Sequence, residues 1–132
     1  MEIKEVELQL SEEATYLAKT SKGEIKVGEK GLNPMELLLV SIGSCSGVDV
    51  YHILKKKRQE IKEIKIFLRG RRREEHPKIY EEIEIKYVAV GKVEEKALQQ
   101  AVKLSTEKYC SVLAMVKPST NLKISWEVKW EE

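Results

Sequence analysis

The 132-residue sequence lacks the short motifs that identify several common enzyme classes. It has no CxxC pair, no cluster of zinc-ligand residues, no phosphate-binding glycine loop and no GxSxG sequence. These absences argue against the commoner metal, nucleotide and serine hydrolase sites. Only two cysteines are present, so the chain also lacks a disulfide scaffold, and a reducing cytosol would make any bridge between them transient.

The sequence also has little net charge and no long apolar run. Lys and Arg number 24 against 22 Asp and Glu, so no overall field attracts nucleic acid or an anionic membrane. No basic start followed by an apolar stretch marks a signal peptide, and the longest apolar run, residues 37–42, is far shorter than the roughly 20 residues of a membrane span. We therefore expect a cytoplasmic protein with a small-molecule or protein partner, and neither a nucleic acid nor a membrane partner.

Alternation of apolar and polar residues predicts three short antiparallel strands in the first thirty residues. The pattern changes at Asn33, which can cap a helix, with Pro34 in the first turn and Glu36 placed as in a capping box. A helix is predicted from about Pro34 to about Lys57. Its first five turns are apolar or small nearly all round, so we expect other elements to wrap it on every side.

The remainder of the chain predicts a hairpin, a helix and a closing strand. The hairpin strands cover about 62–72 and 78–90, the helix covers 93–109, and the strand covers 121–130. Strands and helices do not alternate regularly, which indicates an α+β fold with antiparallel sheets around the long helix. The length fits a single domain, residues 1–132, that gains stability by forming an oligomer.

Cys45 lies near the middle of the long predicted helix and has two interpretations. Most cysteines on apolar helices are buried structural thiols, whereas a reactive thiol needs a nearby cation, helix N-terminus or base. Asp49 lies about 40° round the helix from Cys45. A facing carboxylate would raise the pKa of the thiol, so activation would have to come from elsewhere in the fold. Cys110 is either an unrelated core thiol or a partner of Cys45, and its spacing leaves both open.

Two stretches of the chain carry a resemblance to a known family. Residues 31–54, GLNPMELLLVSIGSCSGVDVYHIL, together with residues 104–112, LSTEKYCSV, resemble the OsmC/Ohr family of hydroperoxide-detoxifying proteins, in its OsmC-like branch. The resemblance implies an OsmC-like α+β fold and an intertwined homodimer. In such dimers, long central helices are buried between wrapped sheets and the two cysteines lie close together near the subunit interface.

The resemblance also implies a reaction. In active family members the cysteine that matches Cys45 attacks an organic hydroperoxide and becomes a sulfenic acid. The cysteine that matches Cys110 condenses with it to a disulfide, which a dithiol such as dihydrolipoamide reduces. A nearby second thiol traps the sulfenic acid before further oxidation. The family uses no metal, haem or other cofactor.

The sequence departs from the family pattern at the residues that support the thiolate. Active peroxidases of the family carry a glutamate at the position of Met35, and here Glu36 is one position later. They also use an arginine near the N-terminus, which this chain lacks. Lys19 could take its place, or Arg72 or Arg73 of the charged RGRRREE stretch could reach in from a dimer partner. The alternative for that stretch is a solvated hairpin end.

Two functions follow from these residues. The first is a thiol-dependent reduction of organic hydroperoxides by Cys45 and Cys110. The second is a dimer that keeps the pocket of the fold but binds an apolar or acyl ligand, or responds to redox conditions, without turning over peroxide. The predicted pocket residues are Met35, Leu38, Asp49 and Tyr109.

Overall fold

The N-terminal strands form a sheet of their own. The computed structural model describes all residues 1–132, in two compact units, Met1–Leu38 and Leu39–Glu132. In the first unit three antiparallel strands lie in the order β1-β2-β3, as the alternation predicted. Their bounds are Glu7–Glu12 for β1, Thr15–Thr20 for β2 and Gly23–Gly28 for β3.

The long helix α1 runs from Pro34 to Lys56, so its predicted bounds are confirmed to within one residue. Asn33 caps the helix, because the backbone N–H of Glu36 donates to Asn33 Oδ1 at 3.0 Å. This bond satisfies one of the amide groups that a helix leaves without an internal partner in its first turn. The local signal at Asn33 and Pro34 was therefore sufficient to place the start of α1.

The expectation that α1 is buried on every side is wrong for the single chain. Its buried residues lie on one face: Ile42, Gly43, Ser46, Val50 and Leu54. Val40, Val48 and Tyr51 are 58%, 57% and 45% exposed. The reason is that the C-terminal unit supplies only one sheet to α1, so one side of this apolar helix remains at the surface.

The C-terminal unit contains a second three-stranded sheet, in the order β4-β5-β6. The predicted hairpin is present as β4, Glu60–Arg72, and β5, Tyr80–Lys92, which pair antiparallel. One strand departs from the predicted antiparallel sheets, because β6, Asn121–Trp130, pairs parallel with β5. The helices between β5 and β6 return the chain to the other end of the sheet, and a parallel pair requires such a crossover.

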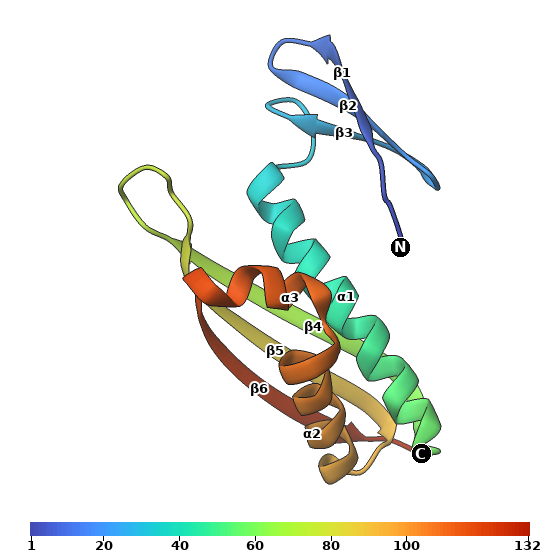
Figure 1. The fold of residues 1–132 in the computed structure, drawn as a ribbon. Coiled ribbons are helices and arrows are strands. Elements are labelled where there is room, and N and C mark those ends of the chain that lie inside the picture. Colours follow the sequence, from blue (N-terminus) through green and yellow to red (C-terminus); the bar gives the residue numbers. More distant parts are fainter. The chain divides into compact units, whose positions relative to one another are not determined.

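Helical segments make this crossover over one face of the sheet (Figure 1). They are α2, Glu95–Leu104; the π-helical turn η1, Ser105–Tyr109; α3, Ser111–Val116; and the 3₁₀ turn η2, Lys117–Ser119. α1 packs closely on β4, since a Cβ added at Gly43 would lie 2.7 Å from Leu68 Cδ1. The sheet thus supports both α1 and the segment that carries Cys110.

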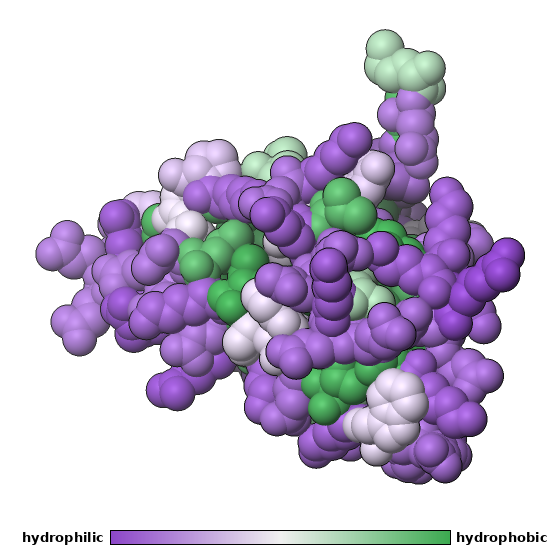
Figure 2. Space-filling view, turned by 90° about the horizontal axis from the view of Figure 1, so that it is seen from below, coloured by the Kyte–Doolittle hydropathy of each residue, from purple (hydrophilic) through white to green (hydrophobic).

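Charged side chains dominate the surface. Figure 2 shows a mostly hydrophilic view with separate apolar patches, as expected for a chain in which 35% of residues are charged. Scattered apolar side chains are normal on a protein surface, whereas apolar side chains gathered on one helix face indicate an interaction site. The exposed face of α1 belongs to the second kind.

Candidate functional site

Cys45 and Cys110 come from different elements of the C-terminal unit. Cys45 lies in α1 and is half-buried. Cys110 directly follows η1 and is 4% exposed. It is the N-cap residue of α3, where its sulfur accepts the Leu113 N–H at 3.5 Å. Its own N–H donates to the Ser105 carbonyl at 2.8 Å, so both the backbone and the side chain of Cys110 are held in place.

The fold brings the two thiols together. Cys45 lies close enough to Cys110 for its side chain to influence the pKa of the Cys110 thiol, and both cysteines are free thiols. The sequence left open whether they are neighbours, because their proximity depends on how α1 and η1 pack. A disulfide between two neighbouring thiols forms where the Cα and Cβ separations of the two cysteines match those of the bond.

The environment distinguishes the two cysteines chemically. Burial raises the pKa of Cys110 from an ordinary 9.0 to about 11, with smaller raising effects from the hydrogen bond and charge of Cys45 and an opposing effect from the Leu113 N–H. Cys110 is therefore a protonated, buried thiol at neutral pH. Cys45 is the more accessible sulfur, which suits it to meet a reagent from solution.

Iodoacetamide at pH 8 is expected to modify Cys45 well before Cys110. The shift from 9.0 to about 11 lowers the thiolate fraction of Cys110 by about 100-fold, and burial slows access further. Labelling of each cysteine is measured by mass spectrometry of peptides, and Cys110 should become reactive as the pH approaches 11. Equal labelling rates at pH 8 would contradict the assignment.

The same shift links Cys110 to stability. Its pKa is higher in the folded than in the unfolded chain, so its stabilising contribution is complete below pH 9 and is lost as the pH rises through about 11.

A chain of buried hydroxyl groups lies beside the thiols. Ser46, which follows Cys45 in α1, has its Oγ 2.7 Å from the Tyr87 hydroxyl and 2.7 Å from Ser105 Oγ. Ser105 Oγ in turn donates to Asp49 Oδ2 at 2.9 Å. Ser46 and Ser105 are fully buried, and so is Tyr87. The chain links α1, β5 and η1 through hydrogen bonds that leave none of these hydroxyls unpaired.

Tyr87 is held as a neutral donor in this chain. Burial is the main reason that its pKa rises to about 12; the charges of Cys110 and Asp49 raise it further, and the hydrogen bond with Ser46 opposes the shift. Sequence reasoning missed Ser46 and Tyr87 as site residues. The available signal was a polar group on an otherwise apolar face, at Ser46 in α1, Tyr87 in β5 and Ser105 after α2.

The other predicted site residues are distributed over both units. Asp49 is half-buried beside Ser105. Tyr109 is 51% exposed, and it lines a surface groove with His52 and Leu104, edged by lysines 55–57. The remaining predicted residues belong to the N-terminal unit, where Lys19 lies in β2 and Met35, Glu36 and Leu38 lie at the start of α1. Their roles at Cys45 stay predictions.

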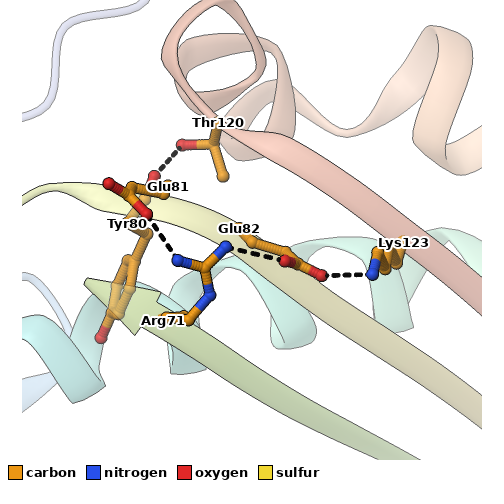
Figure 3. Close-up of polar contacts among 6 residues, drawn as sticks. All are labelled: Arg71, Tyr80, Glu81, Glu82, Thr120 and Lys123. Atoms are coloured by element: carbon orange, nitrogen blue, oxygen red, sulfur yellow. Dashed lines mark hydrogen bonds and ion pairs between the residues drawn. The ribbon is translucent and has the colours of Figure 1, made fainter. Parts of the chain in front are cut away.

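The arginine stretch begins with an ion-pair network across the second sheet. Arg71 pairs with Glu81 at 2.5 Å and with Glu82 at 3.0 Å, and Glu82 also pairs with Lys123 at 2.8 Å (Figure 3). Hydrogen bonds from Lys123 and then Arg71 hold the pKa of Glu82 below its usual value. The network joins β4, β5 and β6, so Arg71 supports the sheet.

Arg72 and Arg73 hold the loop of the same hairpin. Arg72 Nε donates to the Lys78 carbonyl at 2.7 Å, and Arg73 Nε donates to the Pro77 carbonyl at 2.6 Å. Within one chain these guanidinium groups therefore bind the loop between β4 and β5. Their approach to Cys45 of a second chain stays a prediction.

Comparison with known proteins decides the family. The family model described as "OsmC-like protein" matches residues 27–125, which include both cysteines. The chain belongs to the OsmC-like family. The resemblance of the two cysteine-containing stretches is thereby confirmed, and the two three-stranded sheets with a long helix are the OsmC-like fold.

Relatives of the OsmC-like chain extend over most of its length. Protein YhfA of Escherichia coli strain K12 is 39% identical over 102 residues, which are 76% of each chain. A hypothetical protein from Aquifex aeolicus VF5 has a crystal structure that is 89% identical, with a TM-score of 0.99 over 100% of both chains. The organic hydroperoxide resistance protein OsmC of Legionella pneumophila shares the fold, with a TM-score of 0.73 and 12% identity over 96% of this chain and 98% of its own.

Membership of this soluble family also explains the apolar character of α1. The helix is long and apolar enough to cross a membrane by length and composition. The core helix of a soluble protein meets the same criteria, and one face of α1 is buried within the domain. The OsmC-like chain is therefore a soluble protein with an apolar core helix, and its family indicates a redox or peroxide-related role.

Proposed function

We propose that this protein is a thiol-dependent redox protein that reduces organic hydroperoxides through a Cys45/Cys110 dithiol-disulfide cycle. The observation that carries the proposal is that a half-buried Cys45 lies near enough to a buried Cys110 to influence the pKa of its thiol. An accessible attacking thiol and a protected second thiol are the arrangement that such a cycle needs. The family to which the chain belongs, and the name of its Legionella relative, support this chemistry.

The cycle balances with the groups that the chain supplies. The Cys45 thiolate attacks one peroxide oxygen, the O–O bond breaks, an alcohol leaves and Cys45 becomes a sulfenic acid. The Cys110 sulfur then forms an S–S bond with Cys45, the S–O bond breaks and water leaves. An external dithiol reduces the disulfide by exchange and supplies the two electrons that the peroxide received. No metal or cofactor takes part.

The thiolate of Cys45 requires a positive charge that its own hairpin arginines do not provide. Arg71 is paired with two glutamates, and Arg72 and Arg73 bind the loop of their own hairpin. We propose that the charge comes from Lys19 or from Arg72 or Arg73 of a second chain, because a guanidinium has five N–H donors and the bonds to its own loop leave donors for a thiolate. Lysine would supply charge without the forked donors by which arginine orients a thiolate.

We also propose that the functional unit is a homodimer. Residues of α1 and β4 form an apolar groove on the surface, and we call it the α1–β4 groove. It is lined by Val40, Val48, Tyr51, Ile64, Ile66 and Leu68, among others. A second copy that covers this groove would bury the exposed face of α1. That arrangement would restore the all-round burial that the helix sequence predicts.

Pure reduced protein treated with an equivalent of cumene hydroperoxide is expected to lose both free thiols within minutes. The loss follows because Cys45 is oxidised first and Cys110 then closes the disulfide. Thiol titration with and without a dithiol reductant measures the change, and the thiols should return after reduction. If both thiols survive the peroxide, the peroxidase proposal fails, and the alternative becomes a dimer that binds an apolar or acyl ligand or responds to redox conditions.

A further inference from the structure

Ser105 joins the two cysteine-bearing segments through two different groups. Its hydroxyl bonds to α1, at Ser46 Oγ and Asp49 Oδ2, 2.7 and 2.9 Å away. Its carbonyl accepts the backbone N–H of Cys110 at 2.8 Å. One residue thus connects the position next to Cys45 with the backbone of Cys110.

The hydroxyl chain has a single direction. A serine hydroxyl has one hydrogen to donate, and Ser105 gives it to the Asp49 carboxylate. Ser46 must then donate to Ser105, and Tyr87 must donate to Ser46. Aligned hydrogen bonds strengthen one another in a buried environment, so the chain forms a stiff link between α1 and η1.

The π-helical turn makes the second connection possible. In η1 the backbone bond from Cys110 returns to the residue five positions earlier, Ser105, rather than four. Such wide turns are rare and occur frequently at functional sites. Here the turn ends at Cys110, and its first residue supplies the contact with α1.

We propose that Ser105 is a positioning residue that holds Cys110 in register with Cys45 for disulfide formation. This inference rests on the proposed function and concerns its second step. In that step the Cys110 sulfur is oxidised and the Cys45 sulfur is reduced, as the S–S bond replaces the S–O bond. The Cys110 proton leaves with the hydroxyl group as water. Ser105 touches none of the reacting atoms, and it acts by fixing the distance between them.

A Ser105→Ala variant is expected to form the disulfide about tenfold more slowly after Cys45 is oxidised, because loss of the hydroxyl frees η1 from α1. A dimedone-type probe that traps sulfenic acid should then label Cys45 more strongly than in the wild type. The rate at which hydroperoxide oxidises Cys45 should not change.

Two control variants accompany this test. Ser105→Thr keeps a hydroxyl and should restore fast formation of the disulfide. Ser119→Ala removes an exposed hydroxyl that bonds only to the Val116 carbonyl, and it serves as the matched control.

A second measurement needs no hydroperoxide. Equilibration with glutathione redox buffers gives the effective concentration of Cys110 at Cys45, which should fall about tenfold in Ser105→Ala, or about 30 mV in reduction potential. If Ser105→Ala does not fold, Asp49→Ala removes the acceptor of the Ser105 hydroxyl and should lower the same quantity.

The two proposals fail in different ways. An unchanged effective concentration and an unchanged closure rate in folded Ser105→Ala would overturn the role of Ser105, whatever the peroxide result. A wild-type protein that resists hydroperoxide but loses effective concentration in Ser105→Ala would overturn the peroxidase proposal and support the positioning role.

Discussion

A Cys45→Ser variant is expected to consume no organic hydroperoxide beyond the background rate, whereas Cys110→Ser should consume one equivalent per chain and then stop. Cys45 is the accessible thiol, and its removal leaves only a buried thiol whose pKa is about 11. Without Cys110, the Cys45 sulfenic acid has no partner in the chain. Both variants therefore lose catalytic turnover completely. Cys45→Ser keeps an unreacted Cys110 thiol, whereas Cys110→Ser ends as the sulfenic acid of Cys45.

Two measurements separate these variants. Peroxide consumption is followed with cumene hydroperoxide and a dithiol reductant, and the state of the remaining cysteine is read by mass spectrometry. Treated with one equivalent of cumene hydroperoxide in the absence of the dithiol, Cys110→Ser should accumulate the sulfenic acid of Cys45, because no second thiol traps it. Wild-type turnover by Cys45→Ser would show that Cys110 or another group is the attacking residue and would reverse the roles assigned here.

Val48→Arg is expected to convert the protein from a dimer to a monomer. Val48 is 57% exposed in the single chain and lines the α1–β4 groove, which we propose is covered by a second copy. A guanidinium group without a partner at the centre of an apolar interface costs several kcal/mol in desolvation. Light scattering after size-exclusion chromatography measures the mass of the assembly.

The matched control is Met115→Arg, which places the same charge at an apolar side chain that is 82% exposed on α3 and outside the groove. Met115→Arg should remain dimeric. If Met115→Arg were monomeric and Val48→Arg remained a dimer, the interface would lie outside the α1–β4 groove.

Monomeric Val48→Arg should also lose peroxidase activity if the charge at Cys45 comes from Arg72 or Arg73 of a second chain. It should keep that activity if the charge comes from Lys19.

Features of the fold that depend on neighbouring residues were predictable from the sequence. The start of α1 follows from Asn33 and Pro34, because a capping side chain acts on amides within its own turn. The β4–β5 hairpin follows from alternation along two adjacent segments. The parallel pairing of β6 with β5 was not predictable, because the direction of a strand is decided by where the preceding helices deliver the chain.

The candidate site divides in the same way. The resemblance of two stretches identified Cys45 and Cys110, and the family was then confirmed. The hydroxyl chain was missed because its members are brought together from α1, β5 and η1, and only packing decides which buried hydroxyl meets which. A polar residue on an apolar face shows that a partner is needed, but it does not identify that partner.

The π-helical turn makes chain length a critical property of the segment between Ser105 and Cys110, in addition to the hydroxyl group of Ser105. Glu107 and Lys108 within the turn are exposed and make no hydrogen bond to either cysteine. Removal of one residue there would leave a segment of ordinary helix, and each residue of a helix contributes about 100° of rotation and 1.5 Å of rise. Cys110 would then point away from Cys45, although no remaining side chain had been changed. The segment therefore tolerates substitution of its exposed residues but not a change in their number.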